Sequence, residues 1–206
     1  GPQSAALAPP PTSTAVVAVA VVAATAYLAA KINKVQTAVD GIATIVNQQD
    51  QRGYLSEARN YMGALSAARE LLNSGAPARE IAPAAQQSAV DLARMRHQML
   101  VFVARLPAIV QDPTTGAPQY AQAVSFMAEM LHTIPSGLWL ERELCLVANQ
   151  PGLGQSRREQ GTTQFKGALA DFKRWCDGQY RDLAEGKGGH AEVLRVQRPS
   201  LKALFE

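Results

Sequence analysis

The chain has 206 residues, of which 47% are hydrophobic and 18% are charged, and its formal net charge is +3. This length is sufficient for one sizeable core, and the ordinary apolar content excludes a protein made mostly of membrane-spanning segments. The basic residues are spread along the chain without the concentrated basic face that nucleic-acid binding requires, so we expect no nucleic-acid partner.

Residues 1–12 form a lead rich in alanine and proline, which we expect to be disordered. Gly1-Pro2 resembles the remnant that a cleaved expression tag leaves. The three consecutive prolines at positions 9–11 are incompatible with a helix interior, whereas the hydroxyl side chains at positions 12–14 can cap a helix that follows. A helix is therefore predicted to begin near Ser13.

Residues 15–30 consist almost entirely of alanine and valine. No charged residue occurs in residues 1–30, and Lys31 and Lys34 follow directly. Since about 20 apolar residues are needed to cross a bilayer, the length of this segment is borderline. Its valine and leucine side chains contribute only about −2 kcal/mol to insertion, which places insertion near balance. The residues expected to contact lipid are Val16, Val17, Val19, Val21, Val22, Tyr27 and Leu28.

Three interpretations of this apolar segment remain open. It can be a membrane helix, held in the bilayer constitutively or conditionally. It can instead be a buried helix of a soluble bundle, or a signal peptide cleaved near Ala24-Thr25-Ala26. If it spans a bilayer, the two lysines place the following residues on the cytoplasmic face. We therefore expect a membrane-associated protein, with a secreted or a soluble cytoplasmic protein as the alternatives.

The same helix is predicted to continue as an amphipathic helix to residue 49. Its apolar positions are separated alternately by four and three residues, the heptad pattern of a helix that packs along a partner helix or in a coiled coil. Because no proline interrupts residues 13–49, the pattern predicts one long helix. The packing seam begins at Leu28 and comprises Ile32, Val35, Val39, Ile42 and Val46.

Residues 50–186 are predicted to form an antiparallel helical bundle. Apolar stripes of helical period, divided by proline and glycine, predict helices over residues 51–73, 83–107, 118–133, 138–148 and 162–185. The tail, residues 187–206, contains two short apolar pieces separated by Pro199, in which short helices are expected. The predicted fold is therefore an all-α bundle of six to seven helices with a long N-terminal helix.

Two segments between these helices are predicted to be loops. Residues 112–118 combine proline, glycine and threonine, which are typical of turns. Residues 150–161 are polar and contain three glycines, so we expect a flexible surface loop there. Arg157 and Arg158 lie in this second segment and are expected to contact an anion or a protein partner. Trp175, one position away from the apolar stripe of its helix, is expected at the edge of the core or on a partner surface.

No set of side chains that would indicate catalysis is found in the sequence. Glu129 and His132 are one helical turn apart, as in di-iron bundles, but the second Glu-x-x-His that such sites need does not occur. Cys145 and Cys176 are isolated in apolar patterns, which favours reduced, buried thiols. Residues 152–156 lack the Gly-Lys-Ser/Thr ending of a phosphate loop. We therefore expect no enzymatic activity, no metal, no cofactor and no small-molecule substrate.

The order of these segments, an uncharged helix followed by a lysine border, a heptad seam and a helical bundle, resembles the architecture of α-helical pore-forming toxins. Such bacterial proteins shield a hydrophobic segment against their own bundle. The resemblance is one of architecture, and it implies a membrane-associated or membrane-inserting protein, toxin-like and pore-forming. The alternative is a non-catalytic helical adaptor or chaperone-like module. A lipid bilayer and a protein partner or second copy of the chain are the expected partners.

Overall fold

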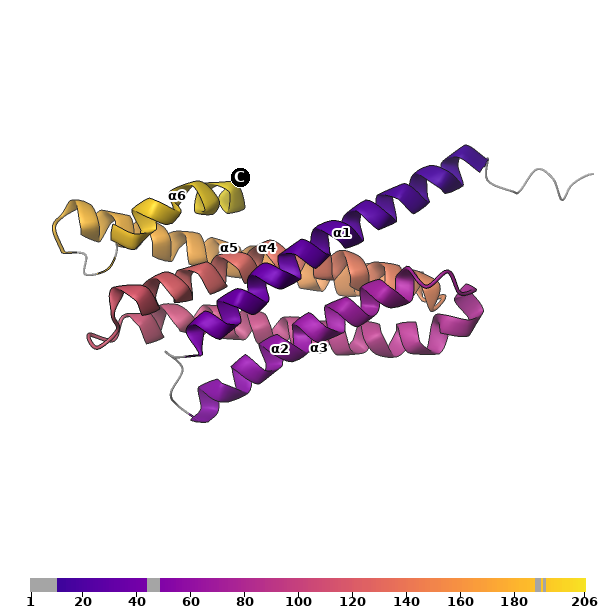
Figure 1. Ribbon diagram of the computed structural model, residues 1–206, viewed down its shortest axis with the longest axis horizontal. Helices are drawn as coiled ribbons and strands as arrows, with labels where there is room; N and C mark the ends of the chain where they lie inside the picture. The colour runs from indigo at the N-terminus through magenta and orange to yellow at the C-terminus, as the bar shows by residue number, and fades with distance from the viewer. Residues whose placement is uncertain (1–10, 44–48, 188–189, 191) are drawn as a thin grey trace, which may run out of the picture.

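The computed structural model describes the backbone of residues 11–43, 49–187, 190 and 192–206, and the side chains of these residues except 11–25 and 49–51. Within these residues the chain is an all-α bundle of six helices and contains no strand, so the predicted fold class is confirmed (Figure 1). The helices are α1 (Pro11–Ile42), α2 (Gln49–Leu72), α3 (Ala78–Val110), α4 (Ala117–Val147), α5 (Pro151–Ala184) and α6 (Glu192–Phe205).

Helix α4 lies at the centre of the bundle and packs against all five other helices. Its sequence explains this position, because apolar residues occur on every side of the helix and sixteen of its residues are buried. The core around it includes a row of aromatic rings from three helices. Tyr54 of α2 stacks on Phe102 of α3, and Phe102 contacts Phe126 of α4, with ring centroids 5.0 and 5.4 Å apart.

Prolines do not end the helices where the sequence pattern predicts. Pro107, Pro135 and Pro199 all lie inside helices, so the two helices predicted over 118–133 and 138–148 form the single helix α4. The tail likewise forms one helix, α6, in place of two short pieces. An internal proline removes one backbone hydrogen bond. At Pro135 this cost is offset by the buried neighbours Ile134 and Leu138, which anchor the helix on both sides.

The predicted flexible loop at residues 150–161 is wrong. Helix α5 begins at Pro151, a favourable first helical residue, and runs without interruption through the glycines of this segment. Gly154 and Gly161 are buried, and a Cβ at Gly154 would come within 2.7 Å of Cβ of Cys145 on α4. These glycines therefore permit close approach of two helices, which local composition alone does not distinguish from a loop.

Helix α1 differs from the prediction at its start. It begins at Pro11 instead of Ser13 and its described part ends at Ile42; residues 44–48, over which the helix was expected to continue to residue 49, lie outside the described residues. Residue 49 instead begins α2. Val46, the last residue of the predicted seam, lies outside the described residues.

Candidate functional site

The first part of α1 leaves the bundle. In Figure 1 the N-terminal end of α1 diverges from the other five helices, whereas its second half lies against α4 and α2. Among the residues whose side chains are described, Leu28 is the first buried one, and the preceding Tyr27 is 53% exposed. Followed backward from its C-terminal end, α1 thus leaves the body near Leu28, inside the uncharged segment of residues 12–30.

The second half of α1 is antiparallel to α4 and completes the core. A Cβ at Gly41 would lie 3.3 Å from Gln122, and Lys31 lies near Glu129, so successive contacts run in opposite directions along the two helices. The seam residues Ile32, Val35, Val39 and Ile42 are all buried. Leu28 is buried as well, 1% exposed, so the expectation that it contacts lipid is wrong; the heptad register turns its side chain toward α4.

An aromatic groove lies at the point where α1 leaves the body. It has a volume of about 270 Å³ and is formed by Tyr27 and Leu28 of α1 and by Pro135, Ser136 and Trp139 of α4. Trp139 is half-buried and lines this groove. The side chains of the predicted lipid contacts Val16, Val17, Val19, Val21 and Val22 lie outside the described residues.

Two lysines follow Tyr27 and Leu28 along α1. The Lys31 ammonium lies 5.7 Å from the centroid of the Tyr27 ring and 3.6 Å from a carboxylate oxygen of Glu129. Lys34, one turn later, is exposed. Burial and the nearby Lys31 charge lower the pKa of His132 below its ordinary value of 6.5. The Glu129 carboxylate thus forms an ion pair with Lys31. In the described part of the chain, no group of three or more potential metal ligands occurs.

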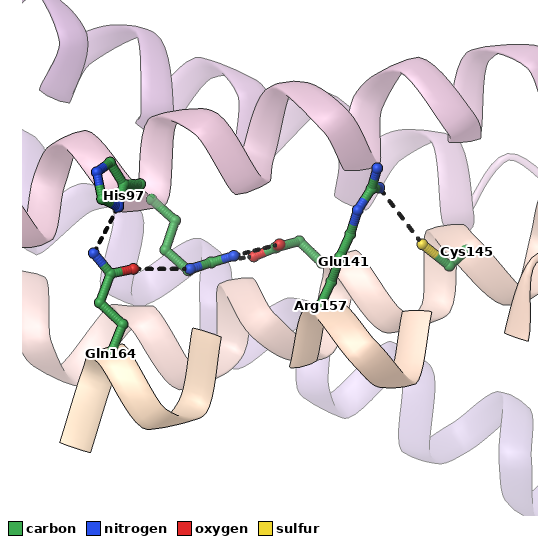
Figure 2. Close-up of polar contacts among 6 residues, drawn as sticks. His97, Glu141, Cys145, Arg157 and Gln164 are labelled. Carbon is green, nitrogen blue, oxygen red and sulfur yellow. Dashed lines mark hydrogen bonds and ion pairs between the residues drawn. The ribbon is translucent and has the colours of Figure 1, made fainter. Parts of the chain in front are cut away.

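A buried polar cluster connects α3, α4 and α5 (Figure 2). The guanidinium of Arg96 donates two hydrogen bonds to the carboxylate of Glu141, at 2.8 and 3.2 Å, and a third at 3.2 Å to Gln164. Gln164 in turn donates from Nε2 to Nδ1 of His97 at 2.7 Å. Only 6% of Arg96 and 1% of Glu141 are exposed. This cluster is a structural clamp, because a substrate cannot reach two charges that are shielded by three helices.

The cluster was not predicted from the sequence, and no local signal identifies it. Arg96 and Glu141 are separated by 45 positions, and each lies beside the apolar stripe of its helix. Burial raises the pKa of the Glu141 carboxyl, and its hydrogen bonds to Arg96 oppose this shift. The pairing depends on how α3 and α4 pack, which only the tertiary structure determines.

The three residues predicted to contact a partner or an anion are not brought together. Arg157 is half-buried, and its Nη1 lies 4.0 Å from Sγ of Cys145 (Figure 2). Arg158 is exposed at the start of α5. Trp175 lies near the other end of α5, where its ring contacts Phe172 and Tyr120. It is half-buried at the edge of the core.

Within the described part of the chain, no helix combines the length and the apolar composition that are needed to cross a bilayer. The chain matches no protein-family model, and comparison with curated proteins and with solved structures found no similar protein.

Proposed function

We propose that this protein associates with a lipid bilayer through residues 12–30 and that the helical bundle is held at the membrane surface. The observation that carries the proposal is the coincidence of two boundaries. The uncharged sequence ends at Lys31, and the described burial of α1 in the core begins at Leu28, close to the point where the helix joins the body. A bilayer is the partner that best matches an uncharged alanine- and valine-rich helix outside a core.

The residues around this boundary support the same partner. Tyr27 and Trp139 are amphipathic rings of the kind that gather at membrane–water interfaces, and Lys31 and Lys34 follow on the side of the body. If the segment spans a bilayer, these lysines favour a cytoplasmic position for the bundle. Because insertion of the alanine-rich segment is near energetic balance, we expect association that depends on conditions.

Co-sedimentation with phosphatidylcholine vesicles tests this function. The parent should pellet with vesicles, and a variant lacking residues 12–25, which retains the buried seam from Leu28, should remain in the supernatant with its helical content preserved. Release of an encapsulated dye would assign the pore-forming, toxin-like activity, whereas binding without release would assign anchoring. If the parent does not bind vesicles, the result would contradict the proposal. It would favour the alternative function, a helical adaptor whose α1 binds a partner protein.

A further inference from the structure

A second groove lies at the end of the bundle from which α1 departs. Because the helices alternate in direction, the connections α2–α3 and α4–α5 both lie at this end, as Figure 1 shows. The end of α4 and the first turns of α5 enclose a groove of about 660 Å³. Its lining includes the polar residues Arg142, Gln155, Arg158, Glu159 and Thr162.

The groove has an excess of positive charge, because two arginines and one glutamate line it. Arg142 and Arg158 are exposed, and neither forms an ion pair with any residue whose side chain the structure describes. Glu159, the acidic residue of the lining, accepts a hydrogen bond from Gln155 at 3.2 Å. The two guanidinium groups therefore remain available to an external anion, and guanidinium groups pair well with phosphate oxygens.

The start of α5 adds to this positive field. Its first turn contains no acidic residue, and Gln150 before it forms no side-chain hydrogen bond that caps the helix. Backbone N–H groups in the first turn of a helix lack partners within the helix and carry partial positive charge. Pro151, the first residue of α5, lines the groove. The helix end and the two arginines thus favour the same kind of ligand.

An exposed leucine lines the charged groove. Leu146 at the end of α4 is 44% exposed and belongs to the lining, whereas Leu153 in the first turn of α5, 43% exposed, lies on a different side of α5. They are two of the few large apolar side chains that the described surface exposes. Arginines mixed with exposed leucines are typical of surfaces that lie on anionic bilayers, where the charge meets phosphate and the apolar group enters the headgroup region.

We propose that this groove binds the phosphate of anionic phospholipid headgroups and orients the bundle on the membrane. The proposal rests on the proposed function, because α1 brings this end of the molecule to the bilayer. Charge complementarity and the position beside the free part of α1 together select a lipid surface as the occupant. The groove adds a preference for lipid charge that the uncharged segment of α1 cannot supply.

Vesicle flotation with the full chain tests this inference. Vesicles of phosphatidylcholine report the contribution of α1, and vesicles that also contain phosphatidylglycerol add that of the groove. The Arg142→Gln/Arg158→Gln double variant should bind the anionic vesicles about 30-fold more weakly than the parent, since each arginine near an anionic surface contributes about five-fold. It should bind neutral vesicles as the parent does. The control Arg181→Gln, an exposed arginine at the other end of α5, should change neither affinity.

A second measurement uses the parent alone and is independent of how the variants fold. Added salt should weaken binding of the parent to anionic vesicles and leave binding to neutral vesicles unchanged. Equal affinity of the parent for both kinds of vesicle, or unchanged binding by the double variant, would overturn the inference. Binding of inorganic phosphate without any effect of vesicle charge would also overturn it, in favour of a free-anion site. If the parent binds anionic vesicles but not neutral vesicles, the result would count against the role of α1 and would still support the groove.

Discussion

At the scale of single residues, the pair Arg96 and Glu141 shows how charge is accommodated inside the bundle. Both groups are removed from water, and each is compensated by the other, with Gln164 accepting one further hydrogen bond. A buried pair of this kind contributes little net stability, because desolvation offsets the attraction between the charges. Loss of one partner is different, since it leaves an uncompensated charge in the core.

Glu141→Leu should therefore lower the free energy of unfolding by about 3–5 kcal/mol, because the guanidinium of Arg96 remains buried without its carboxylate. The double variant Arg96→Met/Glu141→Leu should recover most of this loss, since neither charge is then buried. Urea denaturation of the parent and both variants measures the effect. A double variant no more stable than the single variant would show that the unpaired guanidinium of Arg96 is not the cause of the loss.

His132 should make stability dependent on pH. Its pKa in the folded protein lies below the ordinary value of 6.5, because of burial first and the Lys31 charge second. The unfolded chain therefore binds this proton more readily than the folded protein, so stability is lost as the pH falls below 6.5 through the folded pKa. His132→Gln should lack this component. The difference in unfolding free energy between parent and variant, measured from pH 8 to 5, should change only below about pH 7; a constant difference would contradict the assignment.

At the scale of helices, α5 is held against α4 and α3 by glycines at positions of close approach. A Cβ at Gly161 would meet the side chain of Leu138 and lie 2.9 Å from Cζ of Arg96. Gly154 and Gly161 are seven residues apart, so they lie on the same face of the helix. The face that carries them is the one that packs against α4.

Gly161→Ala should destabilise the protein, although alanine is the better helix former, because the added methyl group displaces Leu138 and Arg96. Gly167→Ala is the matched control on the same helix, since nothing lies within 4 Å of a Cβ there. That substitution should stabilise the protein by up to about 1 kcal/mol. Thermal unfolding of both variants checks the pair. Equal stabilisation by the two alanines would mean that α5 is not closely packed at Gly161.

The helix scale also shows what the sequence could predict. The 3–4 spacing of apolar residues located the helices and the buried positions of α1, because that period is a direct consequence of helix geometry. Proline and glycine were less informative. Pro135 lies inside α4 because packing on both sides offsets its missing hydrogen bond, and Gly154 is a packing residue in place of a loop residue. The spacing of Gly154 and Gly161 was a usable signal, whereas the pairing of Arg96 with Glu141 depends on tertiary packing alone.

At the scale of the whole molecule, one end of the bundle carries the features that we relate to membranes. The free part of α1, the groove with Tyr27 and Trp139, and the arginine-lined groove of α4 and α5 all belong to this end. The other end carries the last turn of α1, the first turn of α2 and the α3–α4 connection. We therefore expect this end of the bundle to face the bilayer, with the free part of α1 directed toward the lipid.

The most direct test of membrane association through residues 12–30 is flotation of the Val19→Arg variant of this 206-residue chain with phosphatidylcholine vesicles. An arginine in the middle of the apolar segment costs roughly 3 kcal/mol of insertion, so binding should fall by about 100-fold. Val90→Arg, at an exposed valine of α3, is the matched control and should bind as the parent does. The expected result is a soluble, folded Val19→Arg variant that no longer floats with the vesicles. A variant that floats as well as the parent, or that unfolds in buffer while the parent ignores vesicles, would contradict it.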